Sequence, residues 1–570
     1  MKLRSLLAGS PNISKEDPAL KRSCLVVSIL VSFVCCGAGW ADDQAVARSI
    51  LSRVELQRSS GDLVINGQPV ASRHVLPRLY ERRAHLPVWN QANVDQLLTA
   101  IDRSREEGLT PEDYHRDGVF EYAEFLRRGI DDSERQAEYD ILATDALIRL
   151  AYNLFFGKAD PHELDPDWNT LRQVQGDDPV AFLEDALNAG KVEAVLEGLS
   201  PLQPYYRDLK AALAVYRGIE AGGGWPVVPA GPTLKPGMRH ARVEALRRRL
   251  AATGDLTDQA SDPALFDDAL VEAVRAFQKR HRMTADGAVG PATLAALQVP
   301  VRARIDQIRV NLERARWMLH DVPQTFVVAD IAGFEAGYFR AGRLIWRSRV
   351  QVGKPYRSTP IFRSNISYLV LNPTWTVPPG IEARDILPAV KRNRGYLAAK
   401  NLRVIDQQGR TVDPARIDWS RYSGRNFPYT FRQDPGPDNA LGQIKFMFPN
   451  PHFVYLHDTP SKDLFERDVR AFSSGCIRVE RPLELAELLL NDPDQWSLEK
   501  IRSAVDTQKT RTVTLPAPVP VLLYYWTAQG QADGSVHFKN DVYRRDPALL
   551  KALDGEFKFR GQPITIGLGY

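Results

Sequence analysis

Two residues near the end of the chain have the types and the spacing that nucleophilic chemistry needs. His457 follows an apolar stretch, and Cys476 stands nineteen residues later in a Gly-containing segment. A thiol attacks as its thiolate, and because a free cysteine has a pKa of about 8.5, only a few per cent is ionised near neutral pH. The pair therefore predicts a cysteine nucleophile that His457 activates, with a thiol pKa well below the free value. An inert buried thiol is the alternative.

The residues around Cys476 fit acyl transfer. Gly475 permits tight backbone geometry, so we expect the amides of Gly475 and Cys476 to face one oxyanion. Arg478 adds positive charge that favours the thiolate, and its guanidinium can hold a carboxylate through two hydrogen bonds. The alternative for Arg478 is that it only braces the loop by bonding backbone carbonyls.

The placement of the cysteines and an apolar run near the N-terminus indicate export. Three of the four cysteines lie in residues 24–36, a run of thirteen mostly apolar residues. Basic residues precede this run and Gly39-Trp40-Ala41 follows it, which is the layout of a secretory signal. A helix of that length reaches about 20 Å, less than the ~30 Å hydrocarbon core. We predict a signal peptide over residues 1–41, a location outside the cytoplasm and no membrane span in the mature chain; an uncleaved anchor is the alternative.

Composition excludes several classes of protein. The 570 residues allow three or four domains at roughly 150 residues each. Hydrophobic residues make up 44% and charged residues 25%, which argues against a largely disordered or many-pass membrane protein. The net charge of +4 gives no reason to expect nucleic acid as a partner. The sequence shows no metal-ligand cluster and no nucleotide-binding loop, so we expect no metal and no cofactor.

Four segments follow the predicted signal. Apolar residues recur every three or four positions over 42–217, which predicts a helical scaffold domain. Ten of the twenty residues in 218–237 are Gly or Pro, which is typical of a linker. Residues 238–298 predict a small three-helix module, and residues 299–322 predict a connecting helix.

The rest of the chain is rich in predicted strands. Apolar patterns typical of strands occur at 326–329, 344–352, 368–371 and 453–456. We assign residues 323–515 to one catalytic domain and residues 516–570 to a C-terminal segment. A polar insert at about 376–435 is expected to be a lid beside the site, and a plain surface insertion is the alternative. The predicted fold class is therefore multidomain α+β, with a helical scaffold, a three-helix module and a β-rich domain that carries a lid-like insert.

The small module resembles a known unit of bacterial wall enzymes. Its apolar helix is followed by Phe277-Gln278, Asp286-Gly287, Val289-Gly290 and Thr293. This order is similar to that of the three-helix peptidoglycan-binding module, which implies that residues 238–298 bind the wall. A structural module that has lost its ligand is the alternative, because all the matching residues could serve as core and turn.

The site motifs carry a more specific resemblance. They are His457-Asp458-Thr459-Pro460 and Ser473-Ser474-Gly475-Cys476-Ile477-Arg478. Both resemble the active-site signature of L,D-transpeptidases with a YkuD-type catalytic domain, and more narrowly the large Gram-negative, YcbB-like branch. Further agreement is found in Val350 to Gly353 followed by Thr359-Pro360, Asn372 to Trp375, Phe448 to Pro451, and Tyr524 to Trp526.

The resemblance implies roles for individual residues. Cys476 would be the nucleophile, His457 its proton acceptor or ion-pair partner, and the main-chain carbonyl of Asp458 would orient the imidazole. The substrate-contacting residues would be Arg478, Tyr455, Ser474, Gly475 and Trp375, although Tyr455 would also fit a core position. Ser474 and Arg478 depart from the commoner family residues, His and Asn, which leaves the finer substrate contacts open.

The resemblance also implies a reaction. Cys476 would attack the carbonyl of meso-diaminopimelate in a tetrapeptide stem, release D-alanine, and pass the acyl group to a second diaminopimelate to give a 3→3 crosslink. Free D-amino acids, water or a lipoprotein lysine are alternative acceptors. The implied partners are peptidoglycan stem peptides and glycan, with other wall-synthesis enzymes as further candidates, and the implied inhibitors are carbapenems.

Two other functions stay open at this point. One is a cysteine peptidase or amidase that cuts wall peptides, although papain-like hydrolases place the cysteine before the histidine in the chain. The other is a non-catalytic wall-binding scaffold, which would have no use for His457, Cys476 and Arg478 together.

Overall fold

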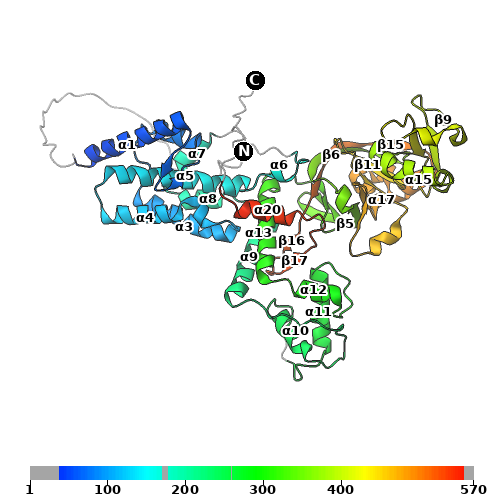
Figure 1. Cartoon of the computed structure of the whole chain (residues 1–570), viewed down its shortest axis with the longest axis horizontal. Coiled ribbons are helices and arrows are strands. Elements are labelled where there is room, and N and C mark those ends of the chain that lie inside the picture. Colours follow the sequence, from blue (N-terminus) through cyan, green and yellow to red (C-terminus); the bar gives the residue numbers. More distant parts are fainter. Residues whose placement is uncertain (1–37, 170–177, 258–259, 558–570) are drawn as a thin grey trace, which may run out of the picture.

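The computed structural model describes residues 38–169, 178–257 and 260–557. The described chain is elongated, with a helical domain at one end, a β-rich domain at the other, and a small helical module that projects from the middle (Figure 1). The predicted multidomain α+β fold class is confirmed. The apolar run of the predicted signal lies outside the described residues, so the signal stays a prediction.

The helical domain is organised around its longest helix, α5. Asp132 caps the start of this helix, and Gly157, at φ +83°, ends it. The elements of the domain are α1 (Ala38–Ser60), β1 (Val64–Ile65), β2 (Gln68–Pro69), α2 (Val75–Arg82), α3 (Gln91–Arg103), α4 (Arg116–Arg128), α5 (Ser133–Phe156), α6 (Pro161–Leu164), α7 (Pro179–Asn188) and α8 (Val192–Glu197).

A buried carboxylate ties several of these helices together. Asp140 on α5 accepts hydrogen bonds from the hydroxyls of Tyr80 on α2 (2.8 Å) and Tyr122 on α4 (3.0 Å). It also accepts from the main-chain amides of Val88 and Trp89. Burial raises the pKa of Asp140 to about 6. All its partners come from the same domain, which fits a structural role.

Three helices join the helical domain to the β-rich domain: α9 (Pro204–Ala221), α13 (Val301–Met318) and α20 (Asp546–Asp554). On α13 the buried Arg316 pairs with Glu313 at 2.8 Å and donates to the carbonyl of Glu107 in the helical domain. On the other side of α13, Asn311 donates to the hydroxyl of Thr527 at 2.7 Å. The helix predicted to be a connector is therefore fixed to both of its neighbours.

The projecting module contains α10 (Arg242–Ala251), α11 (Asp268–Arg280) and α12 (Pro291–Leu297) around its own apolar core. The buried amide of Gln278 donates to Asp286 (2.7 Å), to the carbonyl of Ala288 (3.0 Å) and to the hydroxyl of Thr293 (3.1 Å). Its carbonyl accepts from the amide of Gly287 at 2.9 Å. The polar residues of this motif thus hold the module together, which is a sufficient structural reason for their presence.

The β-rich domain is a nine-stranded sheet in the order β13-β5-β14-β12-β11-β6-β15-β3-β4, and β4 also pairs with β5, so the sheet closes on itself. The β12–β14, β13–β5 and β15–β3 pairs are parallel. The strands are β3 (Phe326–Asp330), β4 (Glu335–Arg340), β5 (Arg343–Gly353), β6 (Phe362–Leu371), β11 (Ile444–Met447), β12 (Leu456–His457), β13 (Ala471–Ser473), β14 (Ile477–Val479) and β15 (Arg511–Tyr524).

The core of this sheet is continuous with the joining helices. One apolar cluster contains Leu213 of α9, Leu312 of α13, Val327 of β3 and Leu522 of β15. The helices α17 (Pro482–Leu490), α18 (Pro493–Trp496) and α19 (Leu498–Asp506) and the small hairpin of β16 (Ala528–Gly530) and β17 (Val536–Phe538) complete the domain. Strand β15 crosses position 515, where the sequence placed the end of the catalytic domain.

The insert forms a subdomain with its own core, which includes the buried Trp419 and Phe431. Its sheet has the order β7-β10-β8-β9. The elements are β7 (Trp375–Thr376), α14 (Pro379–Ile381), a π-helical turn (Glu382–Ile386), α15 (Leu387–Arg392), α16 (Tyr396–Ala399), β8 (Leu402–Ile405), β9 (Thr411–Val412) and β10 (Thr430–Gln433). In Figure 1 the subdomain lies at the end of the molecule farthest from the helical domain.

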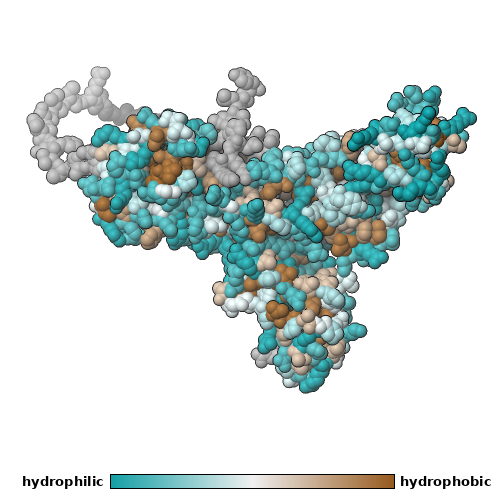
Figure 2. Space-filling view, in the orientation of Figure 1, coloured by the Kyte–Doolittle hydropathy of each residue, from teal (hydrophilic) through white to brown (hydrophobic). Residues whose placement is uncertain are grey.

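On the face shown in Figure 2, hydrophobic residues lie in separate small patches, with hydrophilic surface between them. Across the described ranges, no helix combines the length and the apolar character needed to cross a bilayer.

One predicted strand is mostly absent. The pattern at 453–456 predicts four extended residues, but β12 begins only at Leu456, and Phe453 has φ +55°. The side chain of Asn450 causes this difference, because its carbonyl accepts from the amides of His452 and Val454 and its amide donates to the carbonyl of Val454. These bonds replace the strand ladder by a tight loop.

Leu522→Ala should destabilise the β-rich domain by about 2–4 kcal/mol, because Leu522 is buried in the shared core and the change leaves a cavity. Thr514→Ala, at an exposed position of the same strand, should change stability by less than about 0.5 kcal/mol. The midpoint of urea unfolding for the full chain measures both. Equal midpoints for the two variants would show that the part of β15 after residue 515 does not contribute to the shared core.

Candidate functional site

The register of four strands places polar side chains in one row. Lys445 of β11 pairs with His457 of β12, and His457 pairs with Arg478 of β14. Arg478 in turn pairs with Gln351 of β5. Directly paired residues of neighbouring strands point to the same face of a sheet. Lys445, His457, Arg478 and Gln351 therefore share one face, which we call the site row.

The opposite face of the same strands is apolar core. Phe446, Leu456 and Ile477 are fully buried there, and each is a chain neighbour of a member of the site row. Because successive side chains of a strand alternate, the burial of these three residues turns the site row away from the core. Core packing thus positions the polar residues.

The nucleophile lies in the turn between β13 and β14. Gly475 has φ +118°, a value that favours glycine. The Ser473 hydroxyl donates to the carbonyl of Cys476 at 2.6 Å and accepts from the amide of Gly475 at 3.1 Å. The Thr359 hydroxyl donates to the carbonyl of Gly475 at 2.8 Å and accepts from the amide of Gly353 at 2.9 Å. Two buried hydroxyls therefore fix the turn.

These bonds correct the predicted oxyanion site. The amide of Gly475 was expected to face an oxyanion together with that of Cys476, but it is occupied by the Ser473 hydroxyl. Among the hydrogen bonds of the described chain, none uses the amide of Cys476. That amide is the member of the predicted pair that stays available to a substrate oxygen.

The environment of the Cys476 thiol disfavours its thiolate. Its Sγ lies 3.6 Å from the carbonyl oxygen of Phe453 and receives a hydrogen bond from the amide of Tyr455. Burial raises the pKa of Cys476, and the amide of Tyr455 and the cations of Lys445 and Arg478 offset only part of that rise. The expectation that the thiol pKa lies well below the free value is therefore wrong for this state, because desolvation of the thiolate outweighs the nearby positive charge.

His457 is held as a neutral base. It is 3% exposed, and its Nδ1 lies 2.5 Å from the carbonyl oxygen of Asp458. A carbonyl can only accept, so the bond to Asp458 places the proton of the neutral imidazole on Nδ1 and leaves Nε2 as the basic nitrogen. Burial, followed by the charge of Arg478, lowers the pKa of His457 to about 3. In this arrangement the thiol bonds the Phe453 carbonyl, and no hydrogen bond of the described chain joins it to His457.

Two cations of the site row lack acidic partners. Arg478 donates to the side-chain amide oxygen of Gln351 at 3.2 Å, and its buried Nε has no partner. The ammonium of Lys445 lies 3.7 Å from the centre of the Tyr455 ring. Burial lowers the pKa of both cations, and within the described chain no carboxylate forms an ion pair with either. Sequence reasoning missed Lys445, since a lysine between Ile444 and Phe446 looks like the solvent side of an ordinary strand.

Ser474 connects the nucleophile turn to the insert. Its exposed hydroxyl accepts from Arg357 at 3.0 Å. The same guanidinium donates to Asp385, in the π-helical turn of the insert, at 2.9 Å. Arg357, which sequence reasoning also missed, therefore joins three segments that lie far apart in the chain.

The two remaining predicted residues have different places. The carboxylate of Asp458 pairs with Lys462 and accepts from the amide of Gln443 at 2.9 Å, so its side chain braces the loop before β11 while its carbonyl orients His457. Trp375 pairs with Gln433 in the sheet of the insert and packs on the core of the insert. It therefore lies at the base of the insert and outside the site row.

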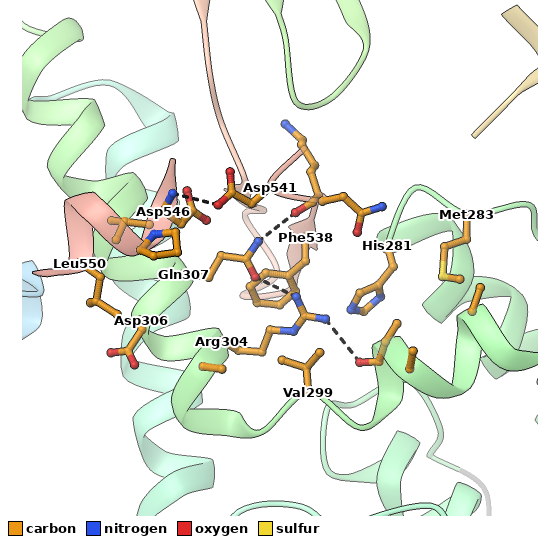
Figure 3. Close-up of a pocket in the computed structure, with 18 residues that line it drawn as sticks. His281, Met283, Val299, Arg304, Asp306, Gln307, Phe538, Asp541, Asp546 and Leu550 are labelled. Carbon is orange, nitrogen blue, oxygen red and sulfur yellow. Dashed lines mark hydrogen bonds between the residues drawn. The ribbon is translucent and has the colours of Figure 1, made fainter. Parts of the chain in front are cut away.

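A separate pocket lies where the module, α13 and the C-terminal segment meet (Figure 3). Its volume is about 650 Å³, and its lining includes Arg304, Gln307, His281 and Phe538. The described residues that line it include no Cys, Ser or Thr. The pocket therefore offers no thiol or hydroxyl comparable with the Cys476 thiol in the turn between β13 and β14. Nor does the described chain contain a group of three or more His, Cys, Asp or Glu residues suited to a metal ion.

Comparison with known protein families assigns three parts of the chain. The L,D-transpeptidase catalytic domain of the YkuD family matches residues 324–519. A scaffold domain matches residues 74–213. A domain described as "Putative peptidoglycan binding domain" matches residues 239–297.

A relative named "Putative L,D-transpeptidase" from Haemophilus influenzae is 39% identical over 220 residues, which are 39% of this chain and 44% of that protein. The match thus spans less than half the length of the relative. Among solved structures, an L,D-transpeptidase from Xylanimonas cellulosilytica is 16% identical, with a TM-score of 0.18, over 52% of this chain and 99% of its own. Another from Stackebrandtia nassauensis is 13% identical, with a TM-score of 0.21, over 52% and 97%.

Both site motifs lie inside the first matched region. The chain therefore carries a YkuD-type L,D-transpeptidase catalytic domain, together with a scaffold domain and a peptidoglycan-binding domain.

Proposed function

We propose that this protein is a periplasmic L,D-transpeptidase that forms 3→3 crosslinks in peptidoglycan through a thioester on Cys476. The observation that carries the proposal is the arrangement of the Cys476 thiol, a neutral His457 and two cations without acidic partners at one face of the sheet. The catalytic-domain match over 324–519 supports the reaction class. The apolar run and basic flank of residues 1–41 support export, with the uncleaved anchor as the alternative.

In the acylation step, Sγ of Cys476 attacks the carbonyl carbon of meso-diaminopimelate in a tetrapeptide stem. The thiol proton passes to Nε2 of His457 as the C–S bond forms, and the amide of Cys476 stabilises the oxyanion. Collapse of this intermediate breaks the C–N bond to D-alanine. The proton on His457 then goes to the departing amine, which leaves a thioester on Cys476.

In the second step, the side-chain amine of another diaminopimelate attacks the thioester carbonyl. His457 accepts a proton from that amine, the C–S bond breaks, and the proton returns to the sulfur. Water in place of the amine would make the protein a peptidase, and a free D-amino acid or a lipoprotein lysine would give other products. The small module would hold the glycan near the site, and other wall-synthesis enzymes would be further partners.

The direct test is turnover of a purified tetrapeptide stem. We expect release of D-alanine and a crosslinked dimer detected by mass, and we expect neither from Cys476→Ala. A carbapenem should add one covalent mass that maps to Cys476. Hydrolysis without a dimer would favour the peptidase, and absence of any turnover would favour the non-catalytic scaffold.

Alkylation of Cys476 by neutral iodoacetamide should rise with pH through a midpoint at or above about 8.5, because burial raises the pKa of the thiol. His457 has a pKa of about 3, so its protonation should produce no further step between pH 5 and 8. His457→Ala should leave the midpoint within about half a unit but abolish most turnover. Mass spectrometry of the Cys476 peptide gives the profile, and a wild-type midpoint below 7 would show a resting thiolate instead.

Arg478→Lys tests whether the guanidinium holds a substrate carboxylate. Loss of the paired hydrogen bonds between the guanidinium and a substrate carboxylate would cost about 1.5–3 kcal/mol. This corresponds to a kcat/KM roughly ten- to more than a hundredfold lower on tetrapeptide donors. The melting temperature and the reaction with iodoacetamide should stay close to wild type. Amidation of the contacted carboxylate should then impair the wild type strongly and the variant little. Equal penalties for both would assign Arg478 to bracing of the loop.

A further inference from the structure

The proposed reaction gives no role to Lys445, although the fold holds this lysine at the site. Lys445 lies in the middle of β11, directly beside His457. Its chain neighbours Ile444 and Phe446 are fully buried on the other face of the sheet. The backbone therefore cannot turn Lys445 away from the site row without exposing that core.

The ammonium of Lys445 lies close to the nucleophile. It sits 3.7 Å from the centre of the Tyr455 ring, and the amide of Tyr455 bonds the thiol of Cys476. The charge of Lys445 also acts on that thiol, since it lowers the pKa of Cys476. Lys445 and Cys476 therefore share Tyr455 as a neighbour, and the charge of the lysine acts on the thiol.

Lys445 differs from buried lysines elsewhere in the chain. Lys158 pairs with Asp113 at 2.7 Å, and Lys539 pairs with Asp330 at 2.5 Å. Within the described residues no carboxylate pairs with Lys445, and its main contact is the face of an aromatic ring. Desolvating an ammonium without a counter-ion is unfavourable, and burial accordingly lowers the pKa of Lys445.

Arg478 has the same property on the other side of His457. It too lacks a carboxylate partner, and its Nε is buried without a hydrogen bond. Lys445 and Arg478 are two strand spacings apart, which is about 10 Å between their backbones. The imidazole that serves the reaction lies between them. The site row therefore presents two uncompensated cations, one to each side of the base.

We propose that Lys445 is a carboxylate-binding residue of the donor site and holds a carboxylate of the stem peptide on the far side of His457 from Arg478. This inference rests on the proposed function. A tetrapeptide stem offers the required chemistry twice, in the C-terminal carboxylate of D-alanine and in the side-chain carboxylate of diaminopimelate. Occupation by either would give the ammonium the counter-ion that the protein does not supply.

The first test does not depend on transpeptidation. Iodoacetate and iodoacetamide both alkylate the thiolate and differ in that iodoacetate carries a carboxylate. The ratio of their rates at Cys476 cancels the thiolate fraction and reports attraction of a carboxylate to the site. We expect Lys445→Gln and Lys445→Met to lower this ratio about three- to tenfold in the full chain, and Lys445→Arg to keep it within about twofold.

The matched control is Lys500→Gln, which removes the same charge from α19, where the ammonium bonds a main-chain carbonyl. This variant should keep the wild-type ratio. Adducts are counted by the mass of the Cys476 peptide, and melting temperatures verify that each variant is folded. An unchanged ratio in folded Lys445→Gln or Lys445→Met would overturn the proposal.

The second test identifies the carboxylate. Tetrapeptide donors are compared in three forms: the free acid, the D-alanine amide and the diaminopimelate side-chain amide. Lys445→Gln should lower kcat/KM at least fivefold on the free acid and have little effect on the form that lacks the contacted carboxylate. Equal penalties on all three forms would overturn the proposal, because Lys445 would then act on the thiol or the fold. If the wild type turns over no donor, the proposed function fails, whereas the alkylation ratio still decides whether Lys445 attracts a carboxylate.

Discussion

The register between β11, β12 and β14 is the constraint on which the site depends. Side chains alternate along a strand, so a slip of one residue in β12 would send His457 into the core and bring Leu456 to the site. The buried Phe446, Leu456 and Ile477 prevent that slip, because each would lose its place in the apolar cluster. The same apolar packing therefore stabilises the sheet and places the reacting groups.

The same burial sets the electrostatics of the resting site. Desolvation favours neutral forms, so His457 stays unprotonated and Cys476 keeps its proton although two cations are nearby. A protonated thiol reacts with oxidants far more slowly than a thiolate. For a protein that works in an oxidising compartment, as we propose, a resting thiol protects the nucleophile until a substrate is bound.

The sequence predicts those parts of the fold whose cause is local. Strands at 326–329, 344–352 and 368–371 are confirmed, because their alternating or apolar patterns lie within the segments themselves. The strand at 453–456 fails because the Asn450 side chain takes over its backbone bonds. Lys445 could not be found this way, since a polar residue in a half-buried strand looks the same whether it faces water or an active site. Only the pairing with β12 tells the two apart.

The turn between β13 and β14, which carries Cys476, is held by two kinds of contact, and only one of them involves the insert. The hydroxyls of Ser473 and Thr359 hold the turn through buried bonds to its own backbone. Arg357 adds an ion pair to Asp385 of the insert, and the side chains of these two residues are 16% and 42% exposed. A displacement of the insert would break this ion pair, in which Arg357 donates to both carboxylate oxygens of Asp385. The buried bonds would persist, and the geometry at Cys476 therefore does not depend on where the insert lies.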